Sequence, residues 1–119
     1  MNVTVADFAN DRIVFTITGT TIAELDNKLN LFFTSEGYKY KGQKGSGKIY
    51  TKGNQVLRAI LGAFWKFFKI YVEVKNQNDI FSVLIQKDAS GLVGGAIGMA
   101  QVRKEFARLT EAFKVYFSR

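Results

Sequence analysis

Apolar and polar residues alternate along two short segments near the start of the chain, residues 3–8 and 12–18. In the second segment, apolar side chains occupy every other position from Ile13 to Ile17, and β-branched residues are frequent. A period of two with such residues predicts a strand with one face on a core. Because Asn10-Asp11 between the segments favours a turn, we expect the two strands to form a hairpin.

An amphipathic helix is predicted from Thr21 to Glu36. Thr21 and Glu24 fit a capping box at its start, and Gly37 fits a left-handed cap at its end. Charged and amide side chains fall on one face of this helix, and apolar side chains on the other. The apolar residues are Ile22, Leu25, Leu29, Phe32 and Phe33. We expect this face to pack in the core.

Residues 38–52 predict a second hairpin, in which the strands YKYK and KIYTK flank the loop GQKGSG. Alternation puts two lysines on one face of the first strand, and two lysines with a tyrosine on one face of the second. These residues are Lys39, Lys41, Lys48, Tyr50 and Lys52. If the register places the two faces together, the sheet carries a ridge of four lysines that could bind a partner. Alternatively, the lysines only protect a sheet edge from aggregation.

Residues 55–66 are compatible with a helix, a strand or a loop; their apolar spacing favours a short helix to about Ala63. The segment is either a buried connector or an element that lies at a membrane surface. The second alternative depends on aromatic residues flanked by basic ones, a composition typical of interfacial segments. The residues concerned are Arg58, Phe64, Trp65, Lys66, Phe67, Phe68 and Lys69.

Strands are also predicted over residues 67–76 and 79–87, paired around the turn at 76–78. Val14 and Leu84 lie on the strand faces that should be polar, so part of that face is expected to be covered by another element or by a partner. A long helix then runs to about Phe117. Its predicted core face consists of Met99, Val102, Phe106, Leu109, Phe113 and Tyr116.

Four glycines, Gly91, Gly94, Gly95 and Gly98, precede or open the last helix. They favour close packing or a flexible entry, although glycines before a helix can also bind an anion. The segment SGLVGGAIGMAQVRKEFARLTEAFKVYF, with LGAFWKFFKIYVEV upstream, resembles small bacterial α+β domains that have no assigned function. The resemblance implies a small bacterial cytoplasmic domain and supplies no site residue. The order of elements also resembles helix-grip folds, in which a long last helix crosses a curved sheet.

These elements predict a single α+β domain over residues 1–119. We expect two layers, with an antiparallel sheet of about five or six strands that packs one face on two main helices. The expected order is β-β-α-β-β-(α)-β-β-α. A chain of this length can bury enough surface to fold without a metal ion or disulfide.

Composition excludes several kinds of chemistry. The chain has no Cys and no His, which removes thiolate catalysis, histidine general bases and the usual zinc sites. No pair of carboxylates is placed by the sequence around a common cleft. We therefore expect a protein that is not an enzyme and that needs no metal or other cofactor. The N-terminal residues lack the pattern of a signal peptide and no apolar run is long enough to span a bilayer, so we expect a cytoplasmic protein.

Charge is distributed unevenly along the chain. The formal net charge is +7, with 17 basic and 10 acidic residues. Residues 37–72 contain no acidic residue but many lysines and aromatic side chains. Clustered lysines attract phosphates and interleaved aromatic rings can stack or insert. We therefore expect a binding module for an anionic partner, either nucleic acid or a membrane surface. The candidate residues are Lys39, Lys41, Lys48, Tyr50, Lys52, Arg58, Trp65, Lys66 and Lys69.

Two other functions remain open. The surplus of large apolar side chains is compatible with a carrier that holds an apolar small molecule between the sheet and the last helix. Exposed aromatic residues over 64–68 would instead favour self-association into a homo-oligomer.

Overall fold

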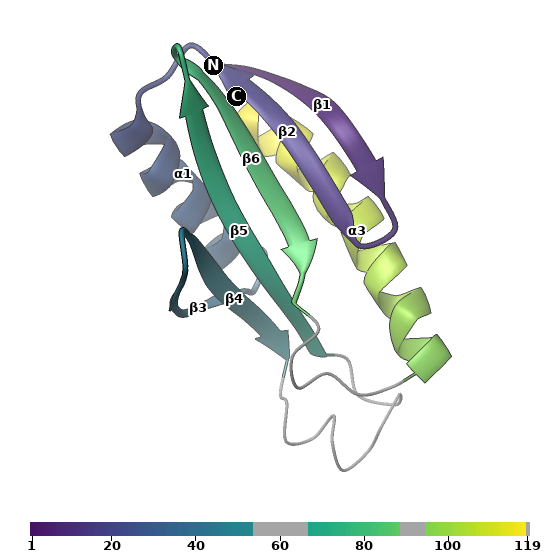
Figure 1. Ribbon diagram of the computed structural model, residues 1–119. Coiled ribbons are helices and arrows are strands. Elements are labelled where there is room, and N and C mark those ends of the chain that lie inside the picture. Colours follow the sequence, from purple (N-terminus) through teal and green to yellow (C-terminus); the bar gives the residue numbers. More distant parts are fainter. Residues whose placement is uncertain (54–66, 89–94, 119) are drawn as a thin grey trace.

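A computed structural model describes residues 1–53, 67–88 and 95–118, without the side chains of 95–98. The described residues form six strands and two helices (Figure 1). The elements are β1 (Asn2–Ala9), β2 (Arg12–Thr18), α1 (Ile22–Ser35), β3 (Lys39–Lys44), β4 (Gly47–Gly53), β5 (Phe67–Gln77), β6 (Ile80–Lys87) and α3 (Gly95–Phe117). The predicted α+β class and the predicted order of strands and main helices are confirmed.

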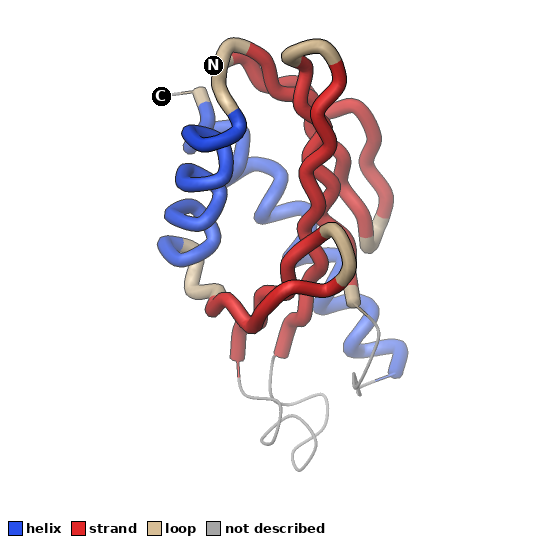
Figure 2. Tube along the Cα trace, turned by 60° about the vertical axis from the view of Figure 1, so that its left-hand side comes forward, coloured by secondary structure: helices blue, strands red, loops and turns tan. Residues whose placement is uncertain are grey.

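The strands form one antiparallel sheet in the order β1-β2-β6-β5-β4-β3. Both helices lie on the same side of the sheet (Figures 1 and 2), which confirms the predicted two layers. We call this the helix side, and we call the opposite side the outer face. No described helix covers the outer face. Val14 and Leu84 lie there as directly opposed partners and are half-buried.

Helix α1 begins and ends where its sequence predicts. The Thr21 hydroxyl accepts a hydrogen bond from the Glu24 backbone N–H at 3.3 Å. At the other end, Tyr38 N–H donates to the Phe33 carbonyl and Gly37 N–H donates to the Thr34 carbonyl. These two bonds define a Schellman motif. The φ of Gly37 is 89°, a conformation that glycine adopts without strain.

Two hairpin turns differ from the prediction. β3 continues to Lys44, so the connection to β4 is only Gly45-Ser46 rather than the six-residue loop expected. A bulge between Tyr40 and Gly42 lets the strand continue through this sequence. The turn after β5 is Asn78-Asp79, slightly later than predicted. Both residues have positive φ, 53° and 64°, which is the requirement of a type I′ turn.

The core lies between the sheet and the two helices. Phe113 of α3 stacks on Phe15 of β2 with ring centroids 3.9 Å apart, and on Phe117 at 4.1 Å. Phe32 of α1 meets Phe113 edge to face at 5.2 Å. Aromatic rings therefore join both helices to the sheet.

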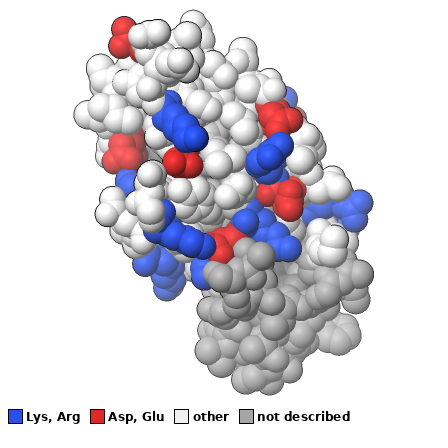
Figure 3. Space-filling model, in the orientation of Figure 1, with Lys and Arg blue, Asp and Glu red and all other residues white. Residues whose placement is uncertain are grey.

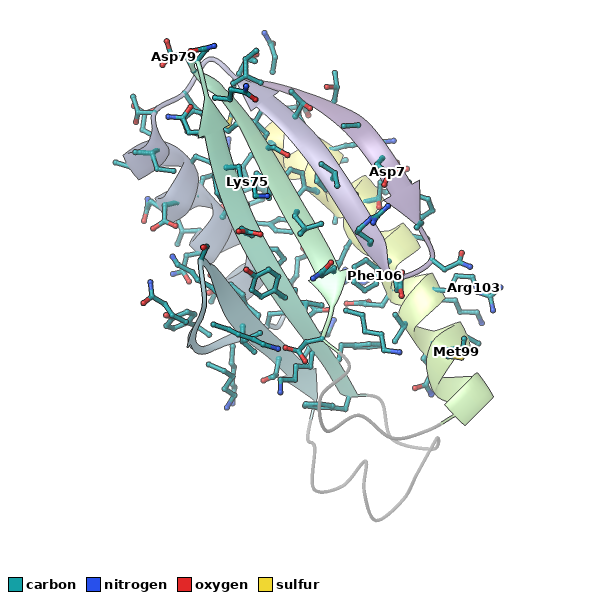
Figure 4. All side chains as sticks on the ribbon, viewed as in Figure 1. Asp7, Lys75, Asp79, Met99, Arg103 and Phe106 are labelled. Carbon is teal, nitrogen blue, oxygen red and sulfur yellow. The ribbon has the colours of Figure 1, made fainter. Side chains whose placement is uncertain are left out.

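The face of α3 that packs in the core differs from the predicted face at its two ends. Val102, Phe106, Leu109 and Phe113 are buried as predicted, but Met99 is 63% exposed. Figure 4 shows Met99 and Arg103 at the margin of the molecule, whereas Phe106 lies against the sheet. The buried aromatic residue in the last turn is Phe117 rather than the half-buried Tyr116. α3 also buries Glu105, which is not part of the predicted core face.

Some predictions lie outside the described residues. They concern the structure of residues 55–66 and the entry loop with Gly91 and Gly94. Gly95 and Gly98 belong to the first turns of α3. Among the helices that the structure describes, none is both long enough and apolar enough to cross a membrane.

Candidate anion-binding site

The register of the β3–β4 hairpin decides which lysines lie together. Lys39 is opposite Thr51, and Tyr40 is opposite Tyr50. Directly opposed residues of an antiparallel pair point to the same side of the sheet. Lys39 therefore shares the outer face with Thr51, whereas the alternate residues of β4, Lys48 and Lys52, point to the helix side. The condition for a ridge of four lysines is not met, because the two lysine pairs lie on opposite faces.

On the helix side, β4 contributes side chains that bond to the helices. Lys48 Nζ lies 2.8 Å from the Asp26 carboxylate of α1. The Tyr50 hydroxyl donates to Asn30 Oδ1 of α1 at 3.2 Å. Tyr50 is 2% exposed, and burial, with smaller effects of Asp26 and Tyr40, raises the pKa of its hydroxyl to about 12. These residues hold α1 on the sheet, so Lys48 and Tyr50 are structural in this arrangement.

A polar network around Glu105 joins α3 to the same edge of the sheet. The buried Tyr38 hydroxyl donates to Glu105 Oε2 at 2.6 Å. Arg108 donates to both oxygens of Glu105, from Nε at 2.8 Å and from a terminal nitrogen at 2.9 Å, and also bonds to Glu36. Lys52 Nζ lies 3.9 Å from Glu105 Oε2.

The contacts within the network change the pKa values of Glu105 and Arg108 so that both side chains are favoured in their charged forms. Burial alone would raise the pKa of Glu105, but hydrogen bonds from Arg108 and Tyr38 outweigh burial, and the pKa is lowered. The hydrogen bond from Arg108 to Glu105 raises the pKa of Arg108. Burial first, and then the charge of Glu105, raise the pKa of Tyr38. These directions favour a neutral Tyr38 phenol, an ionised Glu105 and a charged Arg108 at neutral pH.

Four lysines gather on the outer face, around a groove of about 750 Å³ that β3, β4 and β5 line. We call it the lysine groove and define it by Lys39, Lys41, Lys44, Lys69 and Asp88. Lys69 enters it because β5 pairs with β4, with Lys69 directly opposite Thr51. Figure 3 looks onto the outer face and shows Lys and Arg atoms gathered over its lower part, where β3 and β4 lie in Figure 1.

One carboxylate balances part of this charge. Lys44 Nζ lies 2.7 Å from Asp88 Oδ2, and the Asp88 side chain is only 3% exposed. The Asp88 backbone N–H donates to the Lys69 carbonyl at 2.9 Å, which fixes the residue at the end of β6. Among the described residues that line the groove there are four lysines and one carboxylate, so their summed charge is positive.

A second groove of about 520 Å³ adjoins the first and shares Lys44 and Asp88 with it. We call it the tyrosine groove, because the ring of Tyr71 lines it together with Glu73, Leu84 and Gln86. Gly47 of β4 makes room for this ring. A Cβ added at Gly47 would come within 2.5 Å of ring atoms of Tyr71, so the ring lies directly against the glycine backbone.

The structure therefore separates the candidate residues that the sequence grouped. Lys39, Lys41 and Lys69 line one groove. The other described candidates, Lys48, Tyr50 and Lys52, face the helices. The remaining three, Arg58, Trp65 and Lys66, lie outside the described residues.

The candidate site residues did not include Lys44, Tyr71 and Asp88, which line the two grooves. Lys44 was assigned to a loop, and the longer β3 brings it onto the sheet. Asp88 was not singled out, because the sequence placed no pair of carboxylates around a common cleft. Tyr71 could have been found from its outward phase in β5 together with Gly47, since a glycine in a strand marks close approach of another group.

Comparison with protein-family models and with curated proteins finds no match to this chain. Within the described residues, no three acidic side chains lie close enough together to hold a metal ion.

Proposed function

We propose that this protein is a non-catalytic binding module that holds a phosphate-bearing anionic partner in the lysine groove. The observation that carries the proposal is the gathering of Lys39, Lys41, Lys44 and Lys69 on an outer face that no described helix covers. Ammonium groups on a concave surface attract polyanions because their fields add and counterions are released on binding.

Lys39 and Lys41 are the cations that best fit this role. Both side chains are exposed, and within the described residues neither forms an ion pair with a carboxylate. Lysines that have no carboxylate partner keep their whole charge for a ligand. The hydroxyl of Thr51, which shares the outer face with Lys39, lines the same groove and supplies a neutral hydrogen-bond donor for phosphate oxygens.

Of the two anionic partners expected from the sequence, nucleic acid has the better support. The membrane alternative depended on insertion of the aromatic run that includes Phe67 and Phe68. Both side chains are buried, and Phe68 belongs to the core cluster, so neither is available to enter a lipid layer. A bacterial cytoplasmic location is part of the proposal, because nucleic acid is abundant there.

The two other functions receive less support from the described residues. The rings of Phe15, Phe113 and Phe117 stack at van der Waals distance between β2 and α3, where an apolar ligand of a carrier would lie. Burial of Phe67 and Phe68 also removes part of the surface expected for self-association.

A salt titration tests the proposal. Affinity for a labelled single-stranded oligonucleotide would be measured by anisotropy from low to high salt, for the native protein and for Lys39→Gln/Lys41→Gln. Each lost phosphate contact should reduce the slope of log affinity against log salt by about 0.7. We therefore expect the double variant to bind more weakly, with a slope reduced by about 1.4.

Lys75→Gln is the matched control. Lys75 is an exposed lysine of β5 that lies toward the turn end of the strand, away from the groove (Figure 4). Lys75→Gln removes one charge where the double variant removes two, and its slope should remain close to the native one. A loss in the control of about half the loss in the double variant would show attraction by net charge alone. Absence of binding to oligonucleotides and to anionic vesicles at low salt would refute the proposed function.

A further inference from the structure

We propose that the partner is a single-stranded nucleic acid, held with its phosphates in the lysine groove and with one base stacked on Tyr71 in the tyrosine groove. This inference rests on the proposed function and adds the class of ligand and the residue that recognises its bases.

The two grooves are adjacent and differ in chemistry. They meet at the Lys44–Asp88 ion pair, which lines both. One side offers lysines, and the other offers an aromatic ring, the apolar side chain of Leu84 and the amide of Gln86. At about 750 and 520 Å³, each is in the size range of a site for a small organic group. A single-stranded nucleic acid is complementary to this pair of grooves, because its charged backbone lies next to bases whose faces are free to stack.

Tyr71 is positioned as a stacking platform. One side of its ring lies against Gly47, with no Cβ between them, and the ring also lines the groove. A ring supported in this way keeps its orientation when a ligand arrives, so little entropy is lost on stacking. Desolvation and the nearby Glu73 carboxylate raise the pKa of the Tyr71 phenol. The phenol therefore stays protonated and adds no negative charge to the groove that the ligand would enter.

Charge fixes which part of the ligand enters which groove. Glu73 and Asp88 line the tyrosine groove opposite Lys44 and Lys87, so this groove has no excess of positive charge. A phosphate gains nothing there and is favoured in the lysine groove. The Glu73 carboxylate is an acceptor for the amino group of a base, as acidic side chains are for cytosine in other complexes.

Stacking on Tyr71 also favours single strands over duplexes. In a duplex both faces of an internal base are covered by neighbouring bases, so Tyr71 would have no base to stack on. Lysines alone would bind both forms through their phosphates. A preference for single strands that depends on Tyr71 is therefore the signature of this arrangement.

The experiment compares the affinity of the protein for a twelve-nucleotide RNA, for the same sequence as DNA, and for its duplex, by fluorescence anisotropy at low salt. The variants are Tyr71→Leu, which removes the aromatic ring, and Tyr71→Phe, which keeps it. The matched control is Tyr40→Leu, since Tyr40 is an exposed tyrosine of the same sheet that packs beside Tyr50 on the helix side, away from both grooves.

We expect Tyr71→Leu to lose roughly 10-fold in affinity for single strands, the order of magnitude of one stacked base. Tyr71→Phe and Tyr40→Leu should bind like the native protein, and duplex binding should not respond to Tyr71→Leu. In the native protein, titration with the single strand should shift the NMR signal of the Gly47 amide, which lies under the ring. This signal provides a test that does not depend on the folding of a variant.

The outcomes separate the two proposals. If Tyr71→Leu binds single strands like the native protein, or if the Gly47 signal does not move, the inference is overturned. If Lys39→Gln/Lys41→Gln still weakens binding in that case, the proposed function stands. Binding to vesicles of anionic phospholipid without binding to oligonucleotides also overturns the inference and leaves the lysine groove as a membrane site. If the native protein binds no polyanion, both the proposed function and this inference are refuted.

Discussion

Lysines of the β3–β4 hairpin lie on both faces of the sheet, and the two sets differ in what surrounds them. On the helix side, Lys48 meets Asp26 of α1 and Lys52 approaches Glu105 of α3. On the outer face, Lys39, Lys41 and Lys44 lie around one groove, where Asp88 is the carboxylate that lines it. Residues of one type, a few positions apart in one hairpin, therefore have different surroundings.

The difference shows that a cluster of lysines in a sequence does not define a binding surface by itself. The bulge at Lys41 and the register of the hairpin assign each lysine to a face. The helices then bring carboxylates to the helix side, and no described helix does so on the outer face. A lysine next to a carboxylate supports the fold, whereas a lysine without one keeps its charge for a partner.

The largest expected loss of stability comes from a substitution on the helix side. Glu105→Ala leaves the buried Tyr38 hydroxyl without its acceptor and removes the carboxylate that Arg108 and Lys52 share. We expect the free energy of unfolding to fall by about 3 kcal/mol, because breaking a buried charged network leaves its partners uncompensated. Urea denaturation followed by circular dichroism measures it.

Glu111→Ala is the control for this effect. Glu111 pairs with Lys114 on the same helix, but its side chain is 73% exposed. Its removal should change stability by less than about 0.5 kcal/mol. Equal effects of the two substitutions would contradict the structural role of the Glu105 network.

The same network predicts how stability depends on pH. The folded-state pKa of Glu105 is lowered from its ordinary value of 4.5. A carboxylate with a lowered pKa contributes stability that is fully present above the ordinary value and is lost as pH falls through the folded-state value. The difference in unfolding free energy between the native protein and Glu105→Gln should therefore be constant from pH 7 to about 5. It should shrink below pH 4.5. Denaturation at a series of pH values checks this, and a difference that grows in acid would disprove it.

A smaller effect is expected where Tyr71 lies against β4 on the outer face. In Gly47→Ala the new methyl group would lie 2.5 Å from the Tyr71 ring, so either the ring or the strand must move. We expect a loss of roughly 1–2 kcal/mol, as for other overpacked sites. In a Tyr71→Leu background the loss should be smaller, since the ring is gone. Additive losses in the double variant would show that the ring and the glycine are not in contact.

The smallest effects on stability are expected for substitutions of single lysines. On the helix side such a substitution should reduce stability, whereas on the outer face it should reduce binding. Lys48→Gln breaks a partly exposed ion pair and should cost up to about 1 kcal/mol at low salt, less at high salt. Lys39→Gln should leave stability unchanged within about 0.5 kcal/mol and should weaken oligonucleotide binding. Thermal melts and anisotropy on both variants test the contrast. If Lys48→Gln binds oligonucleotides more weakly than Lys39→Gln does, the binding surface lies on the helix side and not on the outer face.

The elements of the fold were predictable because their signals are local. The capping residues Thr21 and Gly37 bound α1, and the alternation along β2 follows from one buried face. Local signals were less reliable at turns. The GQKGSG sequence indicated a loop, but a bulge extends β3 through its first half and brings Lys44 onto the sheet.

The candidate site was predictable only in part. Lys39, Lys41 and Lys69 were identified from charge, but Tyr71 and Asp88 were not, since neither is a basic side chain. They join the lysines through pairing of β5 with β4 and through the end of β6, contacts between residues far apart in the sequence. Glu105 was left out of the predicted core face because helical periodicity cannot show a buried hydrogen-bond partner such as Tyr38.

The sequence by itself determined the strands, the two helices, their order and the positive charge of residues 37–72, because these depend on periodicity, caps and composition. Only the tertiary structure decided which lysines lie together, which of them meet a carboxylate, and which ring adjoins them. Those properties depend on strand register and on helix placement. A shift of one residue in register moves a side chain to the other face of a sheet.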